Sequence, residues 1–349
     1  MTKQTIIIGG GHNGLVCACY LAKAGHQVTV IERRALLGGA AVTEAFHPGF
    51  RNSTASYTVS LLHPRIISDL KLYDHGLRIV PRKVNNYLPM PSGDAFCTYA
   101  DSKKTLEEVR RQNPGDVEGL RHFNKKMAAI VPIIRDQMLK TPPSLQAGGL
   151  PDLMKLFSLS RHFKKLTADE KSFAQALFIR SPGELLEDYL TTPVIQAWLA
   201  FDAMVGHYAS PYHPGSGYVL LHHHLGEAAG VPGAWGHAMG GMGAVTGSMA
   251  KQAASLGVQF LLESSVKVIM TSKGRASGVE LESGECLGAD LVVANINPKM
   301  LFLDILQTDQ VPPAIKAHFQ RYKMQSGTFR MNLALSQLPA FDARTPPHY

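Results

Sequence analysis

The feature that most constrains the fold is a glycine-rich turn between a short apolar run and a helical pattern near the N-terminus. Residues 5–8 form the apolar run, which is typical of a strand buried on both faces of a parallel sheet. The glycines that break this run are Gly9, Gly10, Gly11 and Gly14. A helical pattern follows over 15–24, with Gly25 available as its C-cap, and 27–31 reads as a second buried strand. Because strand crossovers are right-handed, this order predicts a parallel βαβ unit.

The glycines have the GxGxxG spacing of a dinucleotide-binding turn, which starts at Gly9. Such a turn needs Gly9 for the tight bend, Gly11 for close approach of the pyrophosphate, and Gly14 for close packing of helix and strand. The N–H groups and the dipole of the helix N-terminus then face the phosphates. Within the motif, the remaining candidate contacts to the cofactor are Gly10, His12 and Asn13.

An acidic residue completes this unit. Glu32 directly follows the second strand, where its carboxylate can accept hydrogen bonds from ribose hydroxyls. A carboxylate at this place favours a plain ribose over a ribose that carries a 2′-phosphate. Strand, turn, helix and acid together predict a dinucleotide site, because an ordinary glycine-rich turn rarely has all four.

The segment after Glu32 distinguishes FAD from NAD. It contains Arg33 and Arg34 and, after three apolar residues, the pair Gly38 and Gly39. This segment resembles that of the glutathione-reductase-like FAD superfamily, whose amine oxidases and carotenoid desaturases carry an arginine and a Gly-Gly at this offset. The resemblance implies FAD, with the segment running back beneath the cofactor and Arg33, Arg34, Gly38 and Gly39 among its contacts.

A second element narrows the resemblance to the phytoene-desaturase-like branch. The element is Gly-Gly-Met-Gly at 240–243, and a helix, strands and the segment 289–295 follow it. In that branch the strand that bears Val266 supplies backbone contacts to the adenine, so we expect this role for Val266. Many relatives have arginine at the position of Ala40, so one contact near the flavin is expected to be absent. Relatives also continue beyond Tyr349 to a Gly-Asp-containing segment that closes the flavin site, so the chain is expected to be a fragment.

The expected fold class is α/β, with a discontinuous glutathione-reductase-like FAD-binding Rossmann domain and an inserted α+β substrate domain. A helical pattern rich in proline covers 104–225, and strand patterns resume from 258 to 294. We therefore assign 1–75 and 236–300 to the FAD-binding domain. The substrate domain is expected to contain 76–235 and 301–349, with its C-terminal part missing.

Composition limits the partners and the compartment. The net charge is +8, but the basic residues are scattered in pairs, which disfavours a nucleic-acid-binding stripe. The four cysteines form neither a CxxC pair nor a zinc-binding pattern, which favours a reducing compartment. With no apolar run of transmembrane length and no room for a signal peptide, we expect a cytoplasmic protein that can contact a membrane peripherally. The family resemblance adds the mitochondrial matrix as an alternative.

No further cofactor is expected. The run His222, His223 and His224 is unsuited to a metal, because consecutive helical residues point in different directions. A second dinucleotide site at 240–247 is disfavoured because no apolar strand precedes it, and helix entry with close packing is the preferred interpretation.

The function that the resemblance implies is removal of a hydride from a small apolar substrate, by C–C desaturation or isomerisation, with electrons passing to an unidentified acceptor. An amine-oxidase-like flavoenzyme and a non-catalytic FAD-binding regulatory protein remain alternatives. No catalytic residue can be assigned, because the flavin carries the organic chemistry.

Overall fold

The computed structural model describes residues 2–144, 149–337 and 339. These residues form two compact units, which are described separately. Unit 1 takes the described residues of Met1–Val80, Gly236–Met324 and Arg330–Ala334. Unit 2 takes those of Pro81–Trp235, Gln325–Phe329 and Leu335–Tyr349.

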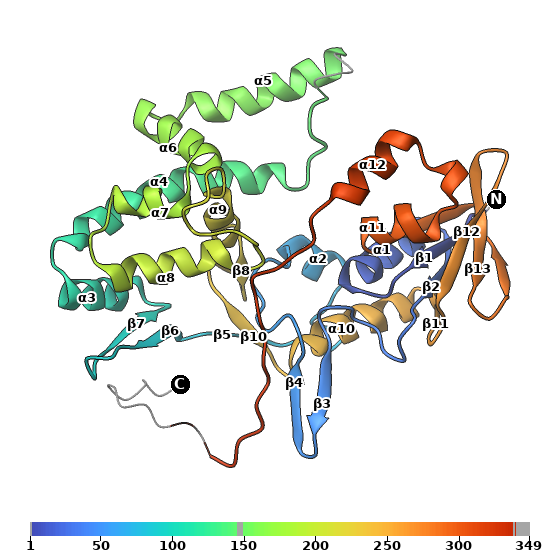
Figure 1. The fold of residues 1–349 in the computed structure, drawn as a ribbon, viewed down its shortest axis with the longest axis horizontal. Coiled ribbons are helices and arrows are strands. Elements are labelled where there is room, and N and C mark those ends of the chain that lie inside the picture. The colour runs from blue at the N-terminus through green and yellow to red at the C-terminus, as the bar shows by residue number, and fades with distance from the viewer. Residues whose placement is uncertain (1, 145–148, 338, 340–349) are drawn as a thin grey trace. The chain divides into compact units, whose positions relative to one another are not determined.

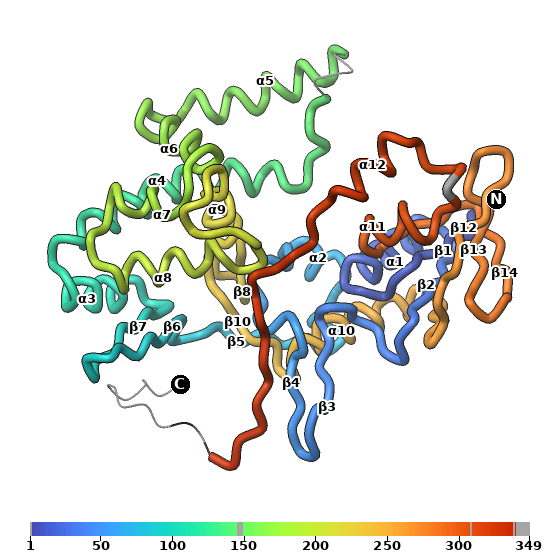
Figure 2. The backbone as a smooth tube through the Cα atoms, viewed as in Figure 1, coloured from blue at the N-terminus to red at the C-terminus, as the bar shows by residue number. Residues whose placement is uncertain are grey.

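A four-stranded parallel sheet, in the order β11-β2-β1-β15, forms the centre of unit 1. Its strands are β1 (Gln4–Ile8), β2 (Gln27–Ile31), β11 (Gln259–Leu261) and β15 (Leu291–Ala294). Ile6 on β1 is in register with Thr29 on β2 and with Val292 on β15. The blue N-terminal strands therefore lie beside orange segments from much later in the chain (Figure 2).

Both faces of this sheet are covered, which explains why β1 is apolar at successive positions. The helices α1 (His12–Lys23) and α10 (Met242–Ser255) cover one face, where Ile7 packs with Leu15 and Met249. On the other face Ile6 packs with Val279 of a second, antiparallel sheet. Neighbouring strand residues point to opposite faces, so a strand buried on both sides needs apolar side chains throughout.

The remaining elements of unit 1 surround these layers (Figure 1). The antiparallel sheet contains β12 (Val266–Ser272), β13 (Arg275–Leu281) and β14 (Cys286–Gly288). Two further strand pairs are β3 (Thr43–His47) with β4 (Phe50–Ser53), and β5 (Ile79–Pro81) with β10 (Gly236–Ala238). The short helices are α2 (Pro64–Asp69), α11 (Pro298–Met300), the π-helical turn η1 (Leu301–Ile305), the 3₁₀ turn η2 (Thr308–Gln310) and α12 (Pro313–Arg321).

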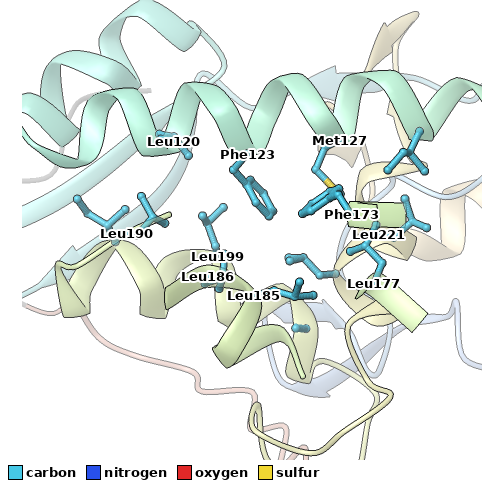
Figure 3. Close-up of a cluster of buried hydrophobic side chains, with 14 of the residues drawn as sticks. Leu120, Phe123, Met127, Phe173, Leu177, Leu185, Leu186, Leu190, Leu199 and Leu221 are labelled. Atoms are coloured by element: carbon cyan, nitrogen blue, oxygen red, sulfur yellow. The ribbon is translucent and has the colours of Figure 1, made fainter. Parts of the chain in front are cut away.

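Unit 2 is mainly helical and has its own core. Its helices are α3 (Ser102–Gln112), α4 (Asp116–Gln137), α5 (Leu150–Lys164), α6 (Ala168–Ile179), α7 (Pro182–Glu187), α8 (Pro193–Met204) and α9 (Tyr218–His224). Its hairpins are β6 (Val84–Pro89) with β7 (Ala95–Tyr99), and β8 (Glu227–Ala228) with β9 (Val231–Pro232). Figure 3 shows Phe123 of α4 and Phe173 of α6 in the core, and their ring centroids lie 5.7 Å apart in an edge-to-face contact.

Several boundaries differ from those expected. Helix α1 begins at His12 rather than at 15, because Gly11 already serves as its N-cap. The segment 226–243, which lies between the helical pattern expected over 104–225 and the strand patterns expected from 258, contains the short strands β8, β9 and β10. Within 301–349, assigned above to the substrate domain, residues 301–324 belong to unit 1, where Ile305 packs against the core around Ile269. Residues 338 and 340–349 of that assignment lie outside the described residues.

Among the helices of the described residues, none has the length and apolar character needed to cross a bilayer.

Candidate dinucleotide site

The glycine turn after β1 has little room for side chains. Gly9 has φ +99°, a conformation that favours glycine, and a Cβ there would lie 2.5 Å from the backbone oxygen of Asn295. A Cβ on Gly14 would lie 2.2 Å from the backbone oxygen of Gly9. Gly14 therefore allows α1 to approach the end of β1, as the motif predicts.

The first turn of α1 is open to an anion. Its N-cap is Gly11, no side chain caps it, and no acidic residue lies in the first turn. The first N–H groups of a helix have no partner within the helix, and they carry the positive end of its dipole. His12 and Asn13 occupy this turn with exposed side chains. The turn therefore offers backbone donors to a phosphate.

Glu32 lies beside this turn at the end of β2. It is 8% exposed, and its carboxylate accepts hydrogen bonds from the backbone N–H of Gly10 at 2.9 Å and of Arg34 at 3.0 Å. These two bonds fix the orientation of the carboxylate. Because a carboxylate has about four lone-pair sites, further acceptor capacity remains for ribose hydroxyls.

The paired glycines pack against the turn. The Gly38 N–H donates to the Gly10 oxygen at 2.8 Å, and Gly38 forms a parallel bridge with Gly11. Gly38 has φ +129°, and a Cβ on Gly39 would lie 3.0 Å from the Cα of Gly11. The structure therefore brings the Gly-Gly element to the GxGxxG turn, although the two are distant in sequence.

The other expected contacts differ in their placement. Arg33 is exposed, whereas the Arg34 guanidinium forms an ion pair with Glu44 at 2.6 Å. Val266 is the first residue of β12. Just before this strand, the backbone N–H of Ser264 donates a hydrogen bond to the backbone carbonyl oxygen of Glu32 at 3.0 Å. Val266 thus lies in a segment next to the acid, whereas Arg34 already has a partner.

Asn295 is a part of the site to which the sequence analysis gave no role. It follows β15, and its side-chain amide donates to the Gly9 oxygen at 3.3 Å. The signal was present, because a polar residue directly after a buried parallel strand falls at the carboxyl edge of the sheet, where ligands bind in such folds.

The second glycine element, at the start of α10, is built differently. The Met242 N–H donates to the Ser53 hydroxyl at 2.9 Å, and the Gly243 N–H donates to the Thr43 hydroxyl at 2.9 Å. A Cβ on Gly241 would lie 2.4 Å from the Thr43 hydroxyl. Protein hydroxyls thus occupy donors that a phosphate would need, and the glycines serve helix entry and close packing, as preferred from the sequence.

The residues around the first turn fit a dinucleotide. A side chain on Gly9 or Gly14 would collide with backbone, the start of α1 lacks a capping side chain, and Glu32 lies buried beside it. Gly11 and the α1 N–H groups would hold the pyrophosphate, and Glu32 would hold the ribose.

Comparisons with known proteins agree with this geometry. The sequence profile described as flavin containing amine oxidoreductase matches residues 14–328. The chain is 34% identical to pyridine nucleotide-disulfide oxidoreductase domain-containing protein 2 of Rattus norvegicus, over 97% of this chain and 61% of that protein. It is 29% identical to the phytoene desaturase (neurosporene-forming) of Rhodobacter capsulatus, over 84% of this chain and 52% of that protein. The chain thus spans less than two thirds of the length of these relatives.

A solved structure shows the same fold. Cyclohexylamine oxidase from Brevibacterium oxydans IH-35A superimposes with a TM-score of 0.53 at 19% identity, covering 92% of this chain and 63% of that chain. The predicted α/β fold class and the predicted resemblance to phytoene-desaturase-like FAD-dependent oxidoreductases are both confirmed. The chain therefore belongs to the flavin containing amine oxidoreductase family, a family of FAD-dependent oxidoreductases, and FAD is its cofactor.

Proposed function

We propose that this chain is an FAD-dependent oxidoreductase that takes a hydride from a small apolar substrate, by C–C desaturation or isomerisation. The observation that carries the proposal is the turn of unit 1, where the uncapped start of α1, buried Glu32 and the Gly38–Gly39 pair converge. The proposed FAD contacts are those expected from the sequence: Gly9, Gly10, Gly11, His12, Asn13, Gly14, Glu32, Arg33, Arg34, Gly38, Gly39 and Val266.

The chemistry follows from this arrangement. A flavin bound here would supply a two-electron acceptor for a hydride from a substrate C–H bond, and desaturation would also release a proton from the neighbouring carbon to solvent. The protein residues bind and orient the cofactor: Gly11 and the α1 N–H groups hold phosphate, and Glu32 fixes the ribose. Desaturation would also require a second substrate that accepts the electrons.

The apolar substrate class is supported by the phytoene desaturase among the relatives. Unit 2 is the proposed substrate domain, and several of its apolar side chains are exposed, including Phe178, Ile179 and Phe201. We place the protein in the cytoplasm, since Cys17, Cys19 and Cys286 form no disulfide among the described residues, as suits a reducing compartment.

The test is anaerobic mixing of the FAD-loaded chain with apolar polyenes or unsaturated lipids, followed by absorbance. The proposal predicts bleaching of the oxidised flavin bands and a product two hydrogens poorer, or an isomer formed without net bleaching. Neither product nor bleaching with any apolar compound, in a chain that does hold FAD, would contradict the proposed substrate class.

The family description favours a second candidate, an amine oxidase. That function predicts bleaching by amines and release of hydrogen peroxide in air. If neither amines nor apolar compounds reduce the bound flavin but a protein partner is captured, the result would support a regulatory FAD-binding protein.

A further inference from the structure

Helix α5 in unit 2 presents an apolar face that no described residue covers. Leu150, Leu153, Met154 and Phe157 are 73%, 58%, 66% and 61% exposed, and no residue of α5 is fully buried. Their spacing of three and four residues places them on one side of the helix. Single exposed apolar residues are normal, but four on one helical face mark an interaction surface.

The opposite side of α5 attaches it to unit 2. Leu156, Leu159 and Phe163 are partly buried, and Phe163 packs against the core formed by the other helices. The helix is therefore anchored by one side, and its exposed apolar side is a separate surface.

The exposed side of α5 is apolar in its N-terminal half and basic in its C-terminal half. Arg161, Lys164 and Lys165 continue the same face at helical spacing and are exposed, and the Lys164 ammonium lies 6.0 Å from the centre of the Phe157 ring. The acidic residue of α5, Asp152, forms an ion pair with Lys155 at 3.0 Å. The face thus joins an apolar patch to a cluster of cations.

We propose that this α5 face, defined by Leu150, Leu153, Met154, Phe157, Arg161, Lys164 and Lys165, docks on the surface of an anionic phospholipid membrane. A helix that lies in a membrane interface buries an apolar face among the acyl chains and keeps basic residues at the headgroups. Each cation near an anionic surface strengthens binding by about fivefold. The apolar patch and the cations therefore act on the same target.

A second copy of the chain fits this face less well. Antiparallel pairing of two α5 helices would set the cations of each against the apolar half of the other. Parallel pairing would bring the two sets of cations together, which is unfavourable. A membrane with anionic headgroups complements both halves.

The test is co-sedimentation of the full chain with phospholipid vesicles, which needs neither FAD nor turnover. Vesicles of phosphatidylcholine alone are compared with vesicles that also contain phosphatidylglycerol. We expect at least about tenfold tighter binding to the mixed vesicles, and a loss of that difference at high salt.

Two variants separate the contributions. Leu153→Asp with Phe157→Asp should weaken binding to mixed vesicles by about tenfold or more, because charged groups replace the apolar contact. Lys164→Glu with Lys165→Glu should remove the preference for mixed vesicles. Tyr73→Asp, at a residue of unit 1 that is 52% exposed, is the matched control and should bind like the parent chain.

Circular dichroism checks that each variant is folded, and Leu153→Ser with Phe157→Ser replaces the aspartate pair if that pair unfolds. Failure of the parent chain to sediment with mixed vesicles would overturn the proposal, as would equal binding by the α5 variants. Self-association that the α5 variants abolish, without vesicle binding, would assign the face to a second copy instead.

Discussion

Replacing Gly14 by alanine should separate α1 from β1 and destabilise unit 1. The new Cβ would lie 2.2 Å from the Gly9 oxygen and 2.9 Å from the side-chain nitrogen of Asn295. Since the Gly9 oxygen belongs to backbone, the helix must move by roughly 1 Å to restore normal contact distances. Overpacking of this kind costs about 1–3 kcal/mol, and the better helix propensity of alanine offsets at most about 1 kcal/mol.

Gly247 provides the matched control, because it also lies within a helix but a Cβ there would meet no atom within 4 Å. Gly247→Ala should therefore stabilise the chain by up to about 1 kcal/mol. Urea unfolding followed by circular dichroism gives both free energies, and hydrogen exchange in β1 and α1 locates the effect. If Gly14→Ala proved as stable as Gly247→Ala, the assigned contact between α1 and the end of β1 would be wrong.

The remaining predictions concern the carboxylate of Glu32 in unit 1, the carboxylate of Asp116 in unit 2 and the partly buried imidazole of His224. Glu32→Ala should weaken FAD binding by about 10- to 100-fold, because charge-assisted hydrogen bonds worth about 1.5–3 kcal/mol are lost. Quenching of FAD fluorescence measures the affinity, and an unchanged affinity would show that Glu32 does not bind the cofactor. Asp116 is 2% exposed and accepts hydrogen bonds from Thr191 and Thr192. Burial alone would raise the pKa of Asp116, but these hydrogen bonds have the larger combined effect, so the pKa is lowered. Asp116→Ala should therefore destabilise unit 2 by about 2–4 kcal/mol at neutral pH and by less as pH falls through the lowered pKa, and an equal loss at all pH values would refute this. Desolvation lowers the pKa of His224, so below about pH 6.5 the unfolded chain binds more protons than the folded chain and the free energy of unfolding should fall. His224→Phe should reduce this pH dependence in urea titrations, and an unchanged slope would contradict the assigned role of His224.

The local motif made the nucleotide fold predictable. An apolar run, a glycine turn and an acid after the second strand together specify one βαβ unit, and the structure has β1, α1 and β2 at those places. The start of α1 was placed too late because glycines are poor helix formers, whereas here Gly14 is required by the contact with the Gly9 oxygen.

Long-range contacts were less predictable. The place of Asn295 after a buried strand indicates the carboxyl edge of the sheet, but it does not show that the amide donates to Gly9, since the two meet only because β15 pairs with β1. The ion pair of Arg34 with Glu44 likewise depends on the path of the chain into β3. Residues 301–324 lie in unit 1, where their place is decided by the packing of Ile305 in its core, and the weak pattern of short helices does not indicate this.

The central claim, that unit 1 holds FAD through its first glycine turn, is tested most directly by the FAD content of the purified chain. The parent chain and a Gly11→Val variant are mixed with FAD, separated from free cofactor, and denatured to identify and count what is released. The account predicts about one FAD per parent chain, because Gly11 lets the backbone approach the pyrophosphate, and much less in the folded variant. Equal FAD in parent and variant, or a folded parent chain that retains none, would contradict it.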